Sequence, residues 1–167
     1  MKPVAAVLVL PALLLAAPAG GQAAAGPSAQ QGGFGAMLLM TADPAAFRRA
    51  WSGPQPPRLN ATTKAARGKP VYAMVIFSGC RAAADGKCRV TGAFSVTRPD
   101  GRPYQAPAQA KIWSGAPAAA RKMLLAEGSV GLKLEPKDPL GAYRVRAVVT
   151  DHVAGISVPV EQAVTAQ

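Results

Sequence analysis

The sequence predicts an all-β fold, an antiparallel β-sandwich of about seven strands preceded by one short helix. Apolar and polar residues alternate in several runs between Pro70 and Thr165, which is the period of half-buried strands. Turn residues separate these runs at short intervals, and no run between them has a helical period. The segment is also close to the ~100 residues of an immunoglobulin domain. We therefore predict an immunoglobulin-like sandwich.

The clearest strand follows the loop 135–142, in which two prolines and a glycine favour a turn over a helix. From Tyr143 the side chains alternate between the core and an outward face, which carries Arg144 and Arg146. A tyrosine at the start of a strand, just after a tight turn, is typical of a tyrosine corner. We predict a structural corner made by three residues, Asp138, Gly141 and Tyr143.

The remaining elements are predicted from their own patterns. Further strands are expected at residues 34–41, 71–78, 89–97, 103–113, 129–135 and 156–164. The run 71–78 is apolar on both faces, which predicts a central strand covered on each side. Asp43 before Pro44 supplies an N-cap and a first-turn proline, so a helix is expected over Pro44–Trp51. Residues 20–33 are expected to be a flexible tail.

Residues 1–25 are predicted to be a signal peptide and leader remnant. Lys2 supplies a positive end, Val4–Ala17 is an apolar run too short for a comfortable membrane span, and alanine-rich cleavage patterns follow it. Residues 26–68 should then hold a flexible tail, the first strand and the short helix, and residues 69–167 the sandwich core. We expect a periplasmic or secreted protein with no transmembrane segment in its mature chain.

Two cysteines, Cys80 and Cys88, are expected to form a disulfide, because thiol pairs in exported proteins usually do. The turn Asp85-Gly86 lies between them, so the bridge should close the base of a hairpin loop. A zinc site would need further ligands, and a redox role would favour a closer pair. The same loop offers Arg81 and Lys87 as a possible binding loop.

The chain is strongly basic, with a formal net charge of +11 and, without Lys2, 18 basic residues against 8 acidic ones. This balance suits polyanionic neighbours, but solubility and compositional bias are the favoured explanation, since net charge bears on non-specific association rather than on a site. Four basic residues are predicted to face outward on their strands, and they would form one basic sheet face if those strands share a sheet. Its residues are Arg144, Arg146, Lys133 and Arg89. No exposed aromatic residues lie between these, which disfavours nucleic acid, and sequence-specific recognition of it is not expected.

No catalytic residue, cofactor or metal ligand is predicted. His152 is the sole histidine, and no Gly-x-Ser-x-Gly motif presents a nucleophile for a triad. Glu135, Asp138 and Asp151 are the acidic candidates for a calcium site or an acid–base pair. Calcium needs six or more oxygens, so turn ordering is the favoured role for these carboxylates. Met37, Met40, Met74 and Met123 are interpreted as core residues rather than soft copper ligands.

Four motifs occur together: Phe77–Cys80 (FSGC), Asp85–Cys88 (DGKC), Arg98–Gly101 (RPDG) and Glu135–Tyr143 (EPKDPLGAY). Together they resemble an uncharacterised family of small bacterial exported proteins, over residues 34–164. That resemblance implies export and an immunoglobulin-like sandwich, and it carries over no functional residue. More loosely, the Pro-Leu-Gly-x-Tyr run resembles immunoglobulin-like and macroglobulin-type sandwiches, but the inter-sheet cysteine pair of antibody domains is missing.

The expected function is a non-catalytic binding module that engages an unknown protein or an anionic envelope component. One alternative is a polyanion or envelope-surface binder that acts through the basic sheet face. Another is an enzyme with an unfamiliar site. The sequence leaves the ligand and the oligomeric state open.

Overall fold

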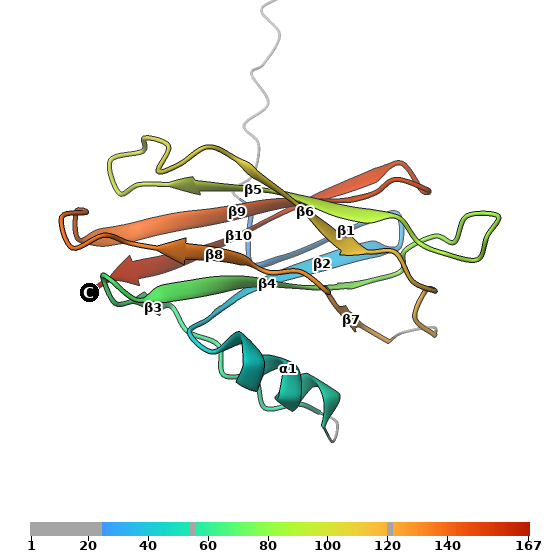
Figure 1. Ribbon diagram of the computed structural model, residues 1–167. Coiled ribbons are helices and arrows are strands. Elements are labelled where there is room, and N and C mark those ends of the chain that lie inside the picture. The colour runs from blue at the N-terminus through green and yellow to red at the C-terminus, as the bar shows by residue number, and fades with distance from the viewer. Residues whose placement is uncertain (1–24, 54–55, 120–121) are drawn as a thin grey trace, which may run out of the picture.

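The computed structural model describes residues 25–53, 56–119 and 122–167. These residues form two five-stranded sheets and one short helix (Figure 1). The predicted signal peptide and leader remnant, residues 1–25, lies outside them apart from Ala25. No helix among the described residues is long and apolar enough to cross a membrane.

The first sheet has the order β1–β2–β4–β7, and β8 also pairs with β4; every pairing is antiparallel. Its strands are β1 (Ser28–Gln31), β2 (Phe34–Thr41), β4 (Pro70–Ser78), β7 (Leu124–Leu125) and β8 (Val130–Lys133). The flexible tail expected over residues 20–33 was wrong at residues 28–31. Gly32 and Gly33 both have positive φ, which permits a tight hairpin that pairs β1 with β2.

The second sheet has the order β3–β10–β9–β5–β6. Its strands are β3 (Lys64–Ala65), β10 (Ile156–Ala166), β9 (Gly141–Asp151), β5 (Val90–Thr97) and β6 (Ala108–Trp113). The strand that follows the 135–142 loop, β9, is therefore its centre, antiparallel to both β5 and β10. The described residues hold ten strands rather than about seven, because β1, β3 and β7 are too short to leave a periodic signal.

One hydrophobic core joins the inner faces of the two sheets. The alternate residues of β9 from Tyr143 to Val149 are all buried, and so are Val90, Phe94 and Val96 of β5. From the first sheet, alternate residues of β2 enter the same core, so the core includes residues well before position 69. Its large members are Phe34, Leu38, Met40, Val71, Val75, Phe77, Val90, Phe94, Val96, Ile112, Leu132, Leu134, Tyr143, Val145, Val149, Val158, Val160 and Val164.

Helix α1 (Pro44–Ser52) covers part of the outer face of the first sheet. Asp43 caps it, since its Oδ1 accepts a hydrogen bond of 2.8 Å from the Ala46 amide. Phe47 is fully buried against Met74 and Ile76 of β4. Figure 1 shows the helix at the bottom of the view, on the side of β4 away from β5. The prediction that β4 is covered on both faces is therefore confirmed.

The loop between β4 and β5 carries the Cys80–Cys88 disulfide, which confirms the predicted pairing. It does not close a hairpin, because β4 and β5 belong to different sheets. The loop instead crosses from one sheet to the other. The prediction of a hairpin was therefore wrong. Apolar alternation shows that two strands follow each other along the chain, but it does not show whether they pair with each other.

Candidate functional site

The corner before β9 is held by Tyr143. Its side chain is fully buried, and its hydroxyl donates a hydrogen bond of 2.9 Å to the carbonyl oxygen of Pro139. Gly141 between them has φ of +127°, a conformation that favours glycine. This bond to a backbone carbonyl four residues upstream is the geometry of a tyrosine corner.

The carboxylate of Asp138 orders the same turn. Its Oδ2 accepts hydrogen bonds from the Glu135 amide at 2.7 Å and from the Tyr104 hydroxyl at 2.6 Å. The Tyr104 bond, followed by the Glu135 bond, lowers the pKa of Asp138 below its usual value. Asp138 is therefore a charged acceptor within the fold, which suits it poorly to donate or collect a proton.

Sequence reasoning missed Tyr104 and Arg98, which complete this cluster. The Tyr104 ring lies edge-on to the Tyr143 ring at 5.6 Å, and the Arg98 guanidinium lies over the Tyr104 ring at 5.3 Å. Burial, and then the bond to Asp138, raise the pKa of Tyr104 to about 12. Arg98 Nη2 also lies 4.0 Å from Asp138 Oδ1. Only the turn motif Arg98–Gly101 marked this region in the sequence.

A pocket of about 310 Å³ opens beside the cluster, on the outer face of the second sheet. Its lining residues come from the turn after β5 and from the start of β9. They are Thr97, Arg98, Pro99, Gly101, Ala142 and Arg144. Two arginines therefore line one hollow. Arg98 Nε is buried and has no hydrogen-bond partner among the described residues.

The four residues of the predicted basic face are not brought together. Arg144 and Arg146 lie on the outer face of β9, where the cross-strand neighbour of Arg146 is Glu161. Lys133 belongs to β8 in the other sheet and pairs with Glu135 at 3.8 Å. Arg89 precedes β5 at the far end of the second sheet. The prediction of one basic face was wrong, because alternation along a strand shows which residues face outward but not which sheet the strand joins.

A second, smaller hollow of about 200 Å³ lies at that far end. Its residues are Arg89, Val90, Thr91, Lys111, Trp113 and Ser114. His152 borders this end, since its Nε2 lies 2.7 Å from the Thr91 hydroxyl. Arg89 is paired with Asp85 at 3.0 Å, whereas Lys111 is exposed and has no ion-pair partner among the described residues. Lys111 therefore supplies the uncompensated charge here.

The predicted binding loop is supported from beneath by Asp151. This side chain is fully buried, and its Oδ2 accepts a hydrogen bond of 2.7 Å from the Arg81 amide. Its Oδ1 accepts bonds from the amides of Val153 and Ala154. The side chains of Arg81 and Lys87 are exposed on either side of the disulfide and form no ion pair within the described parts of the chain. Asp151 thus fixes the loop and takes no part in an acidic cluster with Asp138.

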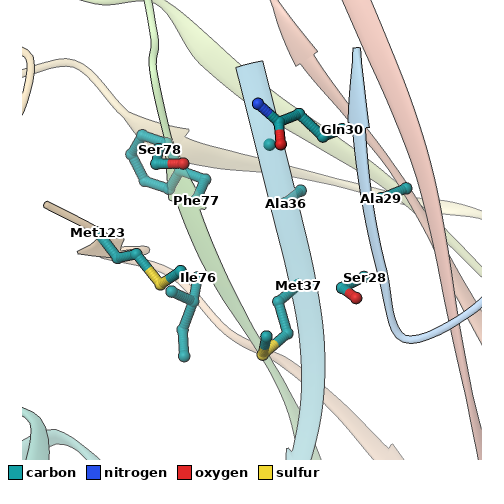
Figure 2. Close-up of a pocket in the computed structure, with 10 residues that line it drawn as sticks. Ser28, Ala29, Gln30, Ala36, Met37, Ile76, Phe77, Ser78 and Met123 are labelled. Atoms are coloured by element: carbon teal, nitrogen blue, oxygen red, sulfur yellow. The ribbon is translucent and has the colours of Figure 1, made fainter. Parts of the chain in front are cut away.

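The outer face of the first sheet holds a groove of about 330 Å³ that α1 leaves uncovered. Figure 2 shows Met37 and Ile76 on β2 and β4, with Met123 beside them and the polar side chains of Gln30 and Ser78 at one end. Met123 is 55% exposed. The groove has no charged lining residue, so it suits a small apolar group rather than an ion. Its methionines contrast with Met40 and Met74, which are fully buried in the core.

The described ranges contain no group of three or more histidine, cysteine or acidic side chains placed to hold an ion. His152 contacts Thr91, and no carboxylate is among its hydrogen-bond partners there.

Comparison with known proteins finds no matching family model and no matching curated protein. Among solved structures, a family 123 glycoside hydrolase from Clostridium perfringens matches 81% of this chain and 27% of its own, with TM-score 0.48 and 11% identity. The alkylpurine DNA glycosylase AlkC of Pseudomonas fluorescens, bound to DNA with an abasic site analog, matches 63% and 28%, with TM-score 0.38 and 14% identity. The chain spans about a quarter of each of these proteins. Likenesses at this level do not bear on activity.

Proposed function

We propose that this chain is an exported, non-catalytic binding module with an immunoglobulin-like fold, and that its ligand carries an anionic group. The observation that carries the proposal is the pocket at the start of β9, where Arg98 and Arg144 line one hollow of about 310 Å³. Guanidinium groups bind carboxylates and phosphates through paired, charge-assisted hydrogen bonds.

The surroundings of Arg98 favour its use as an anion ligand. Its side chain is held over the Tyr104 ring, which restricts the guanidinium before any ligand arrives. Asp138 is the nearest carboxylate, but at 4.0 Å its contact with Arg98 is loose, and its Oδ2 is already engaged by Tyr104 and Glu135. The Arg98 side chain is 35% exposed, so its Nη donors are available to a second anion, whereas its Nε is buried.

Arg144 supplies the second charge. It is exposed on β9 and has no ion-pair partner in the described part of the chain. Its cross-strand neighbour is Thr97, whose hydroxyl adds a neutral donor to the same pocket. The net charge of the chain, +11, would attract anionic ligands to this surface before specific contacts form.

Three features support the other parts of the proposal. The Cys80–Cys88 disulfide is of a kind that persists in oxidising compartments, which favours the periplasm or the medium. The corner at Tyr143 and two sheets around one core, antiparallel except for the β3–β10 pair, favour an immunoglobulin-like sandwich. Asp138 and Asp151, both buried, use their carboxylates on hydrogen bonds within the fold, which favours binding over acid–base chemistry.

An NMR titration with inorganic phosphate and with galacturonate, a monosaccharide carboxylate, tests the proposal. We expect saturable shifts of the backbone amides at residues 97–98 and 142–144, and affinity reduced at least fivefold in Arg144→Ala. Arg49→Ala is the matched control, because Arg49 is an exposed arginine on α1. Shifts spread over the whole surface, or equal losses in the two variants, would show that only non-specific charge is at work.

A further inference from the structure

We propose that the groove on the outer face of the first sheet binds a free fatty acid, a single acyl chain that ends in a carboxylate. The juxtaposition that carries the proposal is an uncharged groove of about 330 Å³ with an exposed lysine, Lys122, beside its polar end. This groove lies on the sheet opposite the Arg98–Arg144 pocket. The proposal therefore adds a second site and does not depend on the proposed function.

The groove runs across the strands between two rows of outward side chains. One row consists of the cross-strand neighbours Ser28, Met37 and Ile76. The other row consists of the cross-strand neighbours Gln30, Gly35 and Ser78. The rows are two residues apart, or about 7 Å, and the three steps from β1 to β7 cover ~14 Å. These dimensions suit one extended chain, and Gly35 leaves the space between its neighbours open.

Three long apolar side chains, those of Met37, Ile76 and Met123, form one side of the groove. Figure 2 shows them next to one another, with Ser78 and Gln30 above them. Met123 is 55% exposed, which leaves apolar surface in contact with water. Methionine side chains are flexible and adapt to the shape of an apolar ligand. An acyl chain laid along them would remove this surface from water.

The other end of the groove suits a carboxylate. The side chains of Gln30 and Ser78 have no hydrogen-bond partner among the described residues, so an amide and a hydroxyl are available as donors. Lys122 lies towards this end, because it precedes Met123 and β7 runs antiparallel to β4. It is exposed and forms no ion pair within the described ranges. The described residues that line the groove include no acidic side chain that would repel an anion.

The paired backbone beneath the groove favours an acyl chain over a peptide. At the groove, β2 pairs with both β1 and β4, and β4 pairs with both β2 and β7. The backbone N–H and C=O groups beneath a ligand are therefore already engaged. A peptide in the groove would turn its own backbone groups towards this surface without partners, which costs free energy at each of them. An acyl chain has no polar group along its length.

NMR spectra of the protein with ¹³C-labelled methionine methyl groups, recorded during a titration with decanoate below its micelle concentration, test the proposal. We expect saturable shifts at Met37 and Met123. Met40 and Met74 are fully buried and serve as internal controls that should not shift. Affinity should rise about twofold per added methylene from hexanoate to decanoate, half the free energy of full burial, because one side of the chain stays in water.

A substitution at Gly35 tests the groove itself. Its φ is not positive, and an added Cβ would meet the Ser78 hydroxyl at 3.5 Å, an ordinary contact. A leucine there is tolerated by the backbone and fills the space between Gln30 and Ser78. Gly35→Leu should therefore reduce the decanoate affinity at least tenfold, because several methylenes lose their contacts. Gly131→Leu, at an exposed glycine of β8 on the same face but outside the groove, is the matched control.

A substitution at Lys122 tests the carboxylate. Lys122→Gln should weaken decanoate about threefold, the size of an exposed ion pair, and should leave decanol unchanged. Lys69→Gln is the matched control, since Lys69 is an exposed lysine that does not border the groove. Arg144→Ala should not alter the shifts of Met37 and Met123, because Arg144 lines the pocket on the other sheet.

Different outcomes overturn different parts of the proposal. Equal affinities of Gly35→Leu and Gly131→Leu, or no shift at Met37 and Met123, would overturn the groove as a site. Equal effects of Lys122→Gln on decanoate and decanol would overturn the carboxylate. Shifts of Met37 and Met123 that follow protein concentration in the absence of any acid would assign the groove to a second copy of the chain and overturn the fatty acid.

Discussion

The hydroxyl of Tyr104 lies 2.6 Å from Oδ2 of Asp138, and this bond joins the connection between β5 and β6 to the turn before β9. The Tyr104 hydroxyl also lies 2.9 Å from the carbonyl oxygen of Lys133. A phenol has one proton to donate, and the charged carboxylate is the stronger and closer acceptor. Since Arg98 stacks on the same ring, the residues that hold the turn also position one wall of the proposed anion pocket.

The stability of Tyr104→Phe should fall less between pH 8 and pH 12 than the stability of the wild type does. Because the folded-state pKa of Tyr104 is raised to about 12, its contribution is fully present below the ordinary value of 10 and is lost as the pH rises towards 12. The measurement is the urea midpoint of wild type and variant at several pH values between 8 and 12. Burial also raises the pKa of Tyr143, so the variant should keep some alkaline loss. Parallel midpoint curves for the two proteins would contradict the prediction.

Asp138→Asn should have the opposite pH signature. The pKa of Asp138 is lowered in the fold, so its contribution is present above the ordinary value of 3.8 and is lost as the pH falls through the folded value. We expect the midpoint difference between wild type and Asp138→Asn to be largest near neutral pH and to shrink below pH 4. Glu127→Gln, at an exposed site, is the control. A midpoint difference that stays constant with pH would mean that the loss of stability comes from altered packing or hydrogen bonding at this position, and not from the charge of Asp138.

Tyr143→Phe should reduce the free energy of unfolding by about 1 kcal/mol or more, because the Pro139 carbonyl loses its donor in a buried setting. Chemical denaturation at neutral pH measures the loss. Tyr72→Phe is the matched control, since Tyr72 is half-buried on β4 and its hydroxyl has no hydrogen-bond partner among the described residues. Equal losses in the two variants would mean that the bond to Pro139 contributes nothing.

The corner could be predicted from the sequence because its bond joins residues four apart in one short segment. The same holds for the bond from the Glu135 amide to Asp138, but the bond from Tyr104 could not be predicted, because Tyr104 lies 34 residues away from Asp138 and reaches it only once β5 and β6 have paired. The basic face failed for a related reason. The alternation correctly predicted that Arg144 and Arg146 face outward. Lys133, however, belongs to the other sheet, and no local pattern shows which sheet a strand enters.

The opening of the disulfide loop yields the sharpest stability test. Gly79 and Gly86 both have φ of +75°, so an alanine at either position carries the same backbone strain, about 1 kcal/mol. At Gly86 the added methyl group meets open space, whereas at Gly79 it overlaps the carbonyl oxygen of Gly33. That oxygen belongs to the backbone of the turn between β1 and β2 and cannot move aside as a flexible side chain does.

We therefore expect Gly79→Ala to cost about 2 kcal/mol more than Gly86→Ala, because the close approach forces the two turns apart. Urea denaturation of both variants under oxidising conditions, with the disulfide intact, measures the difference. Since backbone strain is common to the two variants, subtracting their unfolding free energies leaves the contact with Gly33. Equal costs would mean that the turn between β1 and β2 yields freely, and that β1 is not held against the start of the disulfide loop.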